Sequence, residues 1–270
     1  MERRRVKVAV AGKGGVGKTT IAGTLARLLG RDGLKILAVD ADPSYTLWSA
    51  LGIPPDEAKQ IVPLTENETL VEERLQIEGM EGYTGFFKMN PRVDDLAEKF
   101  AVRGPDNVSL LVAGTVEIGG SGCMCPSATL LKTLMRHLIL GTDEAFVMDM
   151  DAGIENLGRG TTRGMDALLV VAEPGRRSLD ILGKIRTLAQ DIDVGRVFAV
   201  GNKVATPDDE SMIRDWVISE GIPLLGIVPL DESIKQADRK GVAPIDLDPN
   251  SPGMLAVRDI KQRLVEASSS

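Results

Sequence analysis

Short apolar runs alternate with longer amphipathic segments along most of this 270-residue chain. The runs are rich in Val, Ile and Leu without strict polar alternation, which is typical of strands covered on both faces. They predict strands at 6–11, 35–39, 108–113, 145–148, 167–171, 197–200 and 224–228. Helices are expected between them at 18–30, 128–140, 178–191 and 207–220. This order predicts the α/β class, with a mostly parallel, doubly wound sheet that binds ligands at the carboxyl ends of its strands.

One stretch, at about 51–107, breaks this rhythm. It is rich in Glu, Pro and Gly, and we interpret it as an insertion of helices and loops. The rest of the chain shows no internal repeat and no convincing linker. Because one core can serve a chain of this length, a single domain over 1–270 is expected.

Composition narrows the possible partners. Hydrophobic residues make up 43% and charged residues 26% of the chain, as in water-soluble proteins. A net charge of −7 and only 3% aromatic residues argue against nucleic-acid binding. No apolar run is long enough to cross a bilayer, and the short one near the start leads into a glycine-rich loop instead of a cleavage site. We therefore expect a cytoplasmic protein with reduced thiols and no membrane partner.

A glycine-rich loop follows the first predicted strand and opens the first predicted helix. It fits G-x-x-x-x-G-K-[ST] with the residues Gly12, Lys13, Gly14, Gly15, Val16, Gly17, Lys18, Thr19 and Thr20. The glycines let backbone amides turn inward around phosphates, and a helix N-terminus adds partial positive charge. Lys18 is expected to reach the outer phosphates and the Thr19 hydroxyl to bind Mg²⁺. The alternative is a glycine-rich turn without chemistry.

Carboxylates follow two other predicted strands. Asp40 and Asp42 come after the strand at 35–39, beside the expected phosphate site. Asp149 ends Phe-Val-Met-Asp, which has the form of a Walker B strand, and is expected to hold Mg²⁺ through water. The residues at 151–153 are interpreted as a switch that responds to the γ-phosphate. Charges that merely solubilise strand ends are the alternative.

The two cysteines of the chain, Cys123 and Cys125, lie in one loop before the helix predicted at 128–140. A helix N-terminus lowers thiol pKa values and thereby favours metal binding. Two thiolates cannot complete a four-coordinate shell, but two copies related by a twofold axis can. Zn²⁺, Ni²⁺, Cu⁺ or an iron–sulfur cluster would suit such a site. Inert buried cysteines and a disulfide or redox switch remain alternatives, and His137 is interpreted as a packing or surface residue.

The segment G-K-G-G-V-G-K-T-T resembles the deviant Walker A superfamily, which includes MinD, ParA and the nitrogenase iron protein. The resemblance implies that Lys13 crosses a dimer interface to the partner's ATP, where a second cation offsets charge on the transferring phosphoryl group. It also implies that Asp42 orients or activates the attacking water, beside Lys13 and Lys18, and that Asp40 supports the Mg²⁺ shell. The alternative for Lys13 is a solvated loop lysine.

The same resemblance implies an adenine site near the ends of two later strands. Asn202 and Lys203 follow the strand at 197–200, and Pro229 and Asp231 follow the strand at 224–228. In the superfamily these positions surround the base. The Asn202 amide has the donors and the acceptor that a purine edge needs. A turn-forming asparagine is the alternative.

Three segments narrow the superfamily further: G-C-M-C-P at 122–126, D-M-D-A-G-I-E-N-L-G-R-G at 149–160 and V-V-A-E-P-G-R-R-S at 170–178. Together they resemble the CooC-type ATPases, the nickel-insertion accessory proteins of carbon monoxide dehydrogenase, with a sister group that serves acetyl-CoA synthase. The resemblance runs from residue 6 to about 231. It implies a MinD-like fold, a dimer formed with nucleotide or metal, and Cys123 and Cys125 as ligands of nickel or zinc shared across that dimer.

The leading hypothesis is an ATP-hydrolysing metallochaperone that uses ATP, Mg²⁺ and Ni²⁺ (or Zn²⁺) and delivers metal to one of those client enzymes. The chain has no histidine-rich tail for nickel storage, so zinc stays a candidate metal. One alternative is a MinD- or ParA-like regulator of a partner, membrane or DNA, and the segment 255–265 is amphipathic although it lacks bulky aromatic residues. An electron-transferring iron–sulfur protein is the other.

Overall fold

The described part of the chain is built around one eight-stranded sheet in the order β3-β4-β2-β5-β1-β6-β7-β8. The structure is a computed structural model, and it describes residues 6–75, 88, 91–114, 126–141, 145–150, 165–191 and 194–268. The strands are β1 (Lys7–Gly12), β2 (Ile36–Ala41), β3 (Val102–Arg103), β4 (Val108–Val112), β5 (Ala145–Met150), β6 (Ala167–Ala172), β7 (Val197–Val204) and β8 (Leu224–Pro229). Neighbours pair in parallel except β3 and β4, which are antiparallel. The predicted α/β class with a mostly parallel sheet is confirmed.

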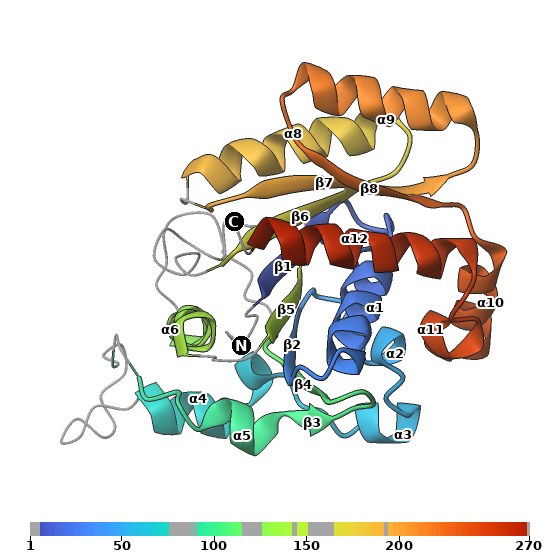
Figure 1. Cartoon of the computed structure of the whole chain (residues 1–270). Helices are drawn as coiled ribbons and strands as arrows, with labels where there is room; N and C mark the ends of the chain where they lie inside the picture. Colours follow the sequence, from blue (N-terminus) through green and yellow to red (C-terminus); the bar gives the residue numbers. More distant parts are fainter. Residues whose placement is uncertain are drawn as a thin grey trace.

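Helices lie on both faces of this sheet (Figure 1). One face carries α1 (Lys18–Arg31), α2 (Leu47–Leu51), α11 (Pro244–Leu247) and α12 (Pro252–Ser268). The other carries α6 (Pro126–Gly141), α8 (Arg176–Asp191) and α9 (Pro207–Ser219). The other helices within the described residues are α3 (Pro55–Ala58), the 3-10 helix η1 (Leu64–Glu66), α4 (Glu68–Leu75), α5 (Leu96–Phe100) and α10 (Glu232–Lys240). The sheet is therefore doubly wound, as predicted.

The central strand β1 shows why the strand sequences lack polar alternation. All of its residues are buried. Ala9 and Ala11 belong to the hydrophobic cluster on the α6 and α8 side, whereas Val8 and Val10 belong to the cluster on the α1 and α12 side. Because successive strand residues point to opposite faces, a strand covered on both faces needs apolar residues at every position.

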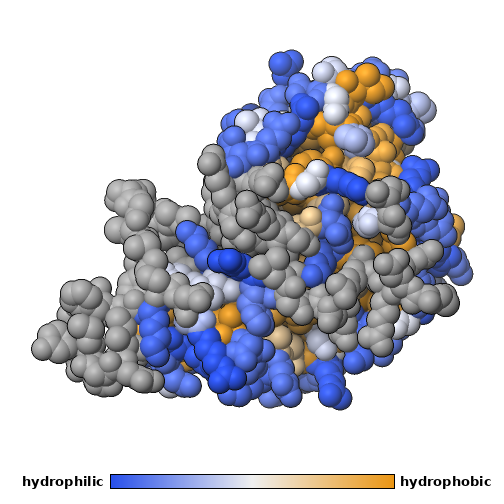
Figure 2. All heavy atoms as spheres, turned by 60° about the vertical axis from the view of Figure 1, so that its left-hand side comes forward, coloured by the Kyte–Doolittle hydropathy of each residue, from blue (hydrophilic) through white to orange (hydrophobic). Residues whose placement is uncertain are grey.

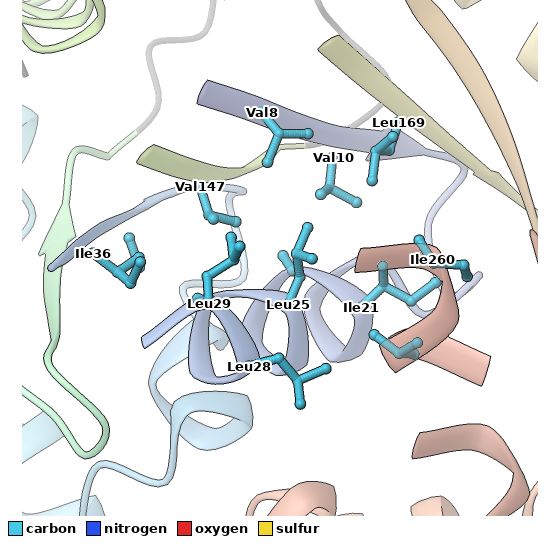
Figure 3. Packing of buried hydrophobic residues seen from close by; sticks show 14 of the residues in the cluster. Val8, Val10, Ile21, Leu25, Leu28, Leu29, Ile36, Val147, Leu169 and Ile260 are labelled. Atoms are coloured by element: carbon cyan, nitrogen blue, oxygen red, sulfur yellow. The ribbon is translucent and has the colours of Figure 1, made fainter. Parts of the chain in front are cut away.

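The helix α1 is fixed against the sheet by an apolar stripe. Ile21, Leu25 and Leu29 are each no more than 1% exposed, and they recur at the spacing of one helical face. Figure 3 shows these side chains between the strand residues Val8 and Val147 and the helix α1 itself. Burying one such side chain stabilises the fold by about 1.5–3 kcal/mol. This packing holds the first turn of α1 at the carboxyl end of β1.

The helix α12 closes the same face of the core. It contacts β8 and α1, and Figure 1 shows it crossing over the end of α1. Its apolar side is buried through Met254, Val257, Ile260 and Leu264. The amphipathic segment at 255–265 therefore has its apolar side in the core, where it is not available to a membrane. No helix in the described ranges is long and apolar enough to cross a bilayer.

Between β2 and β4 the described residues form short helices, as expected, and the edge strand β3. The hydrophobic pattern does not predict β3. β3 turns into β4 through Asp106 and Asn107, whose φ angles are 54° and 58°. Left-handed backbone at both central positions is what a tight hairpin turn requires. This turn also packs on α1, because a Cβ on Gly30 would overlap the carbonyl oxygen of Asp106.

One arginine of α1 joins this turn to two further elements. Arg27 is 2% exposed, and its guanidinium donates to the Leu51 carbonyl at the end of α2 and to the carboxylates of Asp106 and Asp246. Asp246 lies in α11. The more exposed Arg31 contacts the same two carboxylates. Arg27 thereby connects α1 to α2, to the β3–β4 turn and to α11.

The outer surface is more hydrophilic than the two hydrophobic clusters of the core. Figure 2 shows one side of the molecule, where most of the described surface is hydrophilic and hydrophobic residues gather in the upper part of the view. The large hydrophobic side chains exposed among the described residues are Val62, Met212, Ile218, Leu230, Val242 and Leu255. Two of them, Leu230 and Val242, lie at the cavity described next.

Candidate nucleotide-binding site

The glycine-rich loop leaves β1 at the middle of the sheet, because β1 has β5 on one side and β6 on the other. Two of its glycines are required by close approach. Gly12 has a φ of 151°, and a Cβ there would overlap the Val171 carbonyl of β6. Gly17 has a φ of 95°, and a Cβ there would overlap the side-chain amide of Asn202. Any larger residue at either position would push the loop away from its neighbours.

Lys18 opens α1 and faces Asp42. The Lys18 ammonium lies 3.3 Å from an Asp42 carboxylate oxygen, and the two side chains are only 6% and 13% exposed. Burial raises the pKa of Asp42, but hydrogen bonds from the Ser44 hydroxyl and amide and the charge of Lys18 outweigh it, so the pKa is lowered. Asp42 is therefore an ionised carboxylate held beside the lysine of the loop.

Asp40 is fully buried and braces the segment that carries Asp42. One of its carboxylate oxygens accepts from the Asp42 amide at 3.1 Å, and the other accepts from the Leu47 amide at 2.9 Å. Burial raises the pKa of Asp40 to about 6, although these backbone hydrogen bonds act against it. Asp40 thus fixes both the Asp42 loop and the start of α2.

Asp149 carries the clearest sign of a cation site. The Thr19 hydroxyl donates to one of its carboxylate oxygens at 2.6 Å. The other oxygen, Oδ1, is buried and has no hydrogen-bond partner. The pKa of Asp149 is raised to about 7, because burial, together with the charge of nearby Asp40, outweighs the Thr19 hydrogen bond that lowers it. A buried carboxylate oxygen without a partner, next to a hydroxyl, fits Mg²⁺, which prefers oxygen ligands.

This donor set is small. Within the described ranges, no group of three or more His, Cys, Asp or Glu side chains could hold a metal ion by itself. Mg²⁺ in nucleotide sites takes one or two protein oxygens and completes its shell with phosphates and water. The pair of Thr19 and Asp149 matches that pattern.

A cavity of about 490 Å³ opens beside the loop. Eight predicted site residues line it: Gly15, Gly17, Thr19, Thr20, Asn202, Lys203, Pro229 and Asp231. Its apolar wall was not predicted and comes mainly from Ile21, Ala50, Val228, Leu230, Ile234, Val242, Pro244 and Val257. A volume of this size, mostly apolar with a few polar groups, is typical of small-molecule sites. The cavity brings the loop and the predicted base-binding residues together.

Asn202 and Lys203 hold the loop from the end of β7. Asn202 is 7% exposed, and its amide nitrogen donates to the Val16 carbonyl at 2.7 Å. This contact uses one N–H of the amide, which also carries a second N–H and a carbonyl oxygen. The Lys203 ammonium donates to the Gly15 carbonyl, and its backbone is left-handed with a φ of 58°.

Asp231 has a structural part in the cavity wall. It caps the N-terminus of α10 by accepting from the Ser233 amide at 2.8 Å. Its other oxygen accepts from the Gly253 amide at the start of α12, at 2.7 Å. The carboxylate that was predicted near the base therefore positions α10 and α12 around the cavity.

Lys13 contacts Glu173, an acidic residue for which we predicted no role. Its ammonium lies 3.7 Å from Glu173, and the Lys203 ammonium lies 3.6 Å from the other oxygen of the same carboxylate. Glu173 directly follows β6, at the sheet edge that carries the phosphate loop. An acidic residue two positions after the predicted strand at 167–171 was the available signal, and it resembles the one that singled out Asp40 and Asp149.

The remaining predicted residues do not line this site in the described part of the chain. Cys123, Cys125 and the switch at 151–153 lie outside the described residues. His137 is exposed on α6. The metal-binding role of the cysteines and the switch therefore stay predictions.

Comparison with known proteins supports the same kind of site. The family model described as CobQ/CobB/MinD/ParA nucleotide binding domain matches residues 7–245. The chain is 42% identical over 245 residues to the carbon monoxide dehydrogenase accessory protein CooC of Rhodospirillum rubrum, covering 90% of this chain and 91% of the relative. It is 43% identical over 244 residues to an uncharacterized ATP-binding protein of Methanocaldococcus jannaschii, covering 90% and 92%.

Solved structures share the fold. MinD in a MinC:MinD complex from Aquifex aeolicus superposes with a TM-score of 0.68 at 21% identity, over 97% of this chain and 96% of that chain. MinD of Pyrococcus horikoshii with Mg-ADP gives a TM-score of 0.64 at 20% identity, over 95% of each chain. The fold, the loop geometry and the sequence similarity agree. The chain therefore belongs to the CobQ/CobB/MinD/ParA nucleotide-binding family and, within it, to the CooC-type accessory proteins.

Proposed function

We propose that this protein is an ATP-hydrolysing metallochaperone that works as a homodimer in the cytoplasm. ATP binding closes the dimer, and a metal ion, nickel in the first place, is the cargo. Its client is carbon monoxide dehydrogenase or acetyl-CoA synthase. The observation that carries the proposal is the 42% identity to CooC over 90% of the chain, together with a phosphate loop of matching chemistry.

The first chemical step follows from the pair of Lys18 and Asp42. These two charges neutralise each other in their ion pair. The triphosphate offers Lys18 a more negative partner, so Lys18 turns to the outer phosphates and Asp42 is released. An ionised Asp42 then accepts a hydrogen bond from the attacking water and takes its proton, as the water oxygen bonds to the γ-phosphorus and ADP leaves.

Mg²⁺ would be held by the Thr19 hydroxyl and, through water, by Asp149, with Asp40 bracing the neighbouring loop. When bound, it supplies positive charge to the phosphate oxygens as the bond to the leaving group breaks. The amides of Gly14, Gly15 and Gly17 line the loop around the same phosphates. The cavity walls around Asn202 and Pro229 hold the adenine.

Lys13 connects hydrolysis to assembly. It is 37% exposed at the rim of the loop, where a second subunit can be reached. In the proposed dimer it contacts the partner's ATP and offsets charge on the transferring phosphoryl group. The same twofold axis pairs Cys123 and Cys125 with their copies, so four thiolates hold one metal ion. Hydrolysis relaxes the dimer and releases the metal to the client.

The test is anaerobic size-exclusion chromatography with metal analysis, with and without Ni²⁺. Wild type is expected to form a dimer with about one metal ion per two chains. A Cys123→Ala/Cys125→Ala double variant should bind no metal yet still dimerise with ATP. A Lys13→Ala variant should keep the metal and lose the ATP-dependent dimer, while Lys184→Ala, which removes an exposed lysine on α8, should behave as wild type.

Two results would contradict the proposal. If wild type binds no metal and dimerises only with ATP, the protein is a partner-switching ATPase without a metal role. A brown protein after anaerobic purification, with iron at the cysteines, would instead support an electron-transferring iron–sulfur protein.

A further inference from the structure

Glu173 lies between two lysines of the nucleotide site. One carboxylate oxygen is 3.7 Å from the Lys13 ammonium, and the other is 3.6 Å from the Lys203 ammonium. The carboxylate is 30% exposed, and the lysines are 37% and 42% exposed. The loop lysine that the proposed dimer needs is thus paired within its own subunit.

The backbone of Glu173 is fixed at this position. Its amide donates to the hydroxyl of Ser178 at 3.1 Å, and Ser178 is 3% exposed in the first turn of α8. The Ser178 amide in turn donates to the Gly175 carbonyl. The residue follows β6, which pairs directly with β1. Glu173 is therefore presented to the phosphate loop by two rigid elements.

We propose that Glu173 is a positioning residue that holds Lys13 in its own subunit and opposes its transfer to the partner's nucleotide. This inference rests on the ATP-dependent dimer of the proposed function. A triphosphate presented by a second subunit carries more negative charge than one carboxylate, so it draws Lys13 away. A diphosphate draws it less. Glu173 thereby raises the ATP requirement for dimer formation.

Lys203 keeps the Glu173 carboxylate paired when Lys13 moves to the partner's nucleotide. It contacts the second oxygen of Glu173 and donates to the Gly15 carbonyl. When Lys13 leaves, the carboxylate keeps one cation beside it. An acid with a second partner can release the first without being left as an uncompensated charge.

The experiment compares the ATP-analogue concentration at which half of the protein is dimeric, measured by light scattering with a nonhydrolysable analogue and Mg²⁺. Glu173→Gln keeps the shape and removes the charge, and its midpoint should fall about threefold, the size expected for losing an exposed ion pair. Glu173→Asp keeps the charge and should restore the wild-type midpoint. Glu220→Gln is the matched control, because Glu220 is also part of an ion pair, with Arg186, but lies at the end of α9, before β8 begins and therefore away from the carboxyl ends of the strands.

A second readout separates a specific hold on Lys13 from a general charge effect. The affinity of the monomer for ADP should change by less than about twofold in Glu173→Gln. An equal gain in ADP affinity would overturn the inference, and so would a midpoint that is unchanged or higher. If wild type dimerises with the analogue and Glu173→Gln behaves identically, only this inference falls. If neither protein dimerises, the ATP-dependent dimer of the proposed function falls with it.

Discussion

Burial of the Asp149 carboxylate lowers the stability of the fold. It is fully buried, its Oδ1 has no partner, and burial raises its pKa to about 7. Asp40, equally buried, has both oxygens bonded to backbone amides. The two acids therefore differ in kind. Asp40 stabilises the fold through two hydrogen bonds, whereas the Oδ1 atom of Asp149 has no partner within the described residues and is placed to bind a ligand.

Asp149→Asn is expected to raise the free energy of unfolding of the nucleotide-free protein, because it removes an ion from the interior. The folded pKa lies above the unfolded one, so the wild type is stable with respect to this group at low pH and loses that contribution as pH rises through about 7. The gain should consequently be larger at pH 8 than at pH 5, as urea denaturation at the two values would show. Mg²⁺-dependent ATP hydrolysis should be lost.

Asp40→Asn serves as the control for this prediction. It replaces one of two accepting oxygens by an amide nitrogen that cannot accept from a backbone N–H. We expect it to lower the free energy of unfolding by about 1–3 kcal/mol. If both asparagine variants destabilise equally, Asp149 is not the unpartnered acid described here.

The residues of the phosphate site could be read from the sequence because their chemistry is local. Gly12 to Thr20 form one uninterrupted motif, and Asp40 and Asp149 directly follow the strands predicted at 35–39 and 145–148. The contacts among them could not be predicted in the same way. Thr19 and Asp149 are 130 positions apart, and Glu173 meets Lys13 only because β6 pairs with β1. Such pairs depend on the order of strands, which hydrophobic periodicity does not encode.

At the scale of elements, α1 is held from two directions. Its apolar stripe lies on the sheet, and Arg27 connects its outer side to α2, the β3–β4 turn and α11. Hydrophobic periodicity predicted the first of these, and the helix itself begins and ends within a residue of the expected 18–30. It predicted neither β3, which has only two residues, nor the arginine contacts, because polar side chains carry no periodic signal.

Arg27→Met should lower the free energy of unfolding by about 2 kcal/mol, as measured by urea denaturation at neutral pH. The change leaves the Leu51 carbonyl and two carboxylates without their buried donor. The full effect of breaking a buried pair is not expected, because Asp246 is 41% exposed.

Arg31→Met is the matched comparison. Arg31 contacts the same two carboxylates but is 36% exposed, so its loss should lower the free energy of unfolding by less than about 1 kcal/mol. Equal effects of the two variants would mean that burial of Arg27 contributes nothing.

The same contacts predict a dependence on acid. Burial raises the pKa of Asp106, but hydrogen bonds from Arg27 and Arg31 outweigh it and hold the pKa below its ordinary value. The resulting stabilisation is present above the unfolded pKa, about 4, and is lost as pH falls through the folded value. Between pH 5 and 3, wild type should therefore lose stability more steeply than Asp106→Asn. Parallel slopes in urea denaturation would contradict this.

At the scale of the whole molecule, the amphipathic helix α12 could either bind a membrane or pack on the core. The segment at 255–265 could have served as a membrane helix in a MinD-like regulator, and its sequence alone left that open. In the fold its apolar side packs on α1 and β8. The doubly wound architecture was predicted from the alternation of strands and helices. The docking of α12 was not, because amphipathicity does not specify what the apolar side contacts.

Ile260→Ala tests this docking. Ile260 is 1% exposed and packs over Gly226 of β8, where even a Cβ would overlap it. We expect a loss of about 3 kcal/mol in the free energy of unfolding. Leu255→Ala, on the same helix at 42% exposure, should change it by less than about 0.5 kcal/mol. Similar values for the two variants would show that α12 is not docked in solution.

The backbone of Lys203 has a consequence for protein engineering. A lysine with a φ of 58° is strained by about 1 kcal/mol or more relative to a residue without a side chain. A stabilisation programme that scores backbone conformation would choose glycine at this position. That choice would remove the amine that binds the Gly15 carbonyl and pairs with Glu173. Thermostable variants should therefore be sought with position 203 held constant, because there the residue with the least strained backbone and the residue that makes these contacts differ.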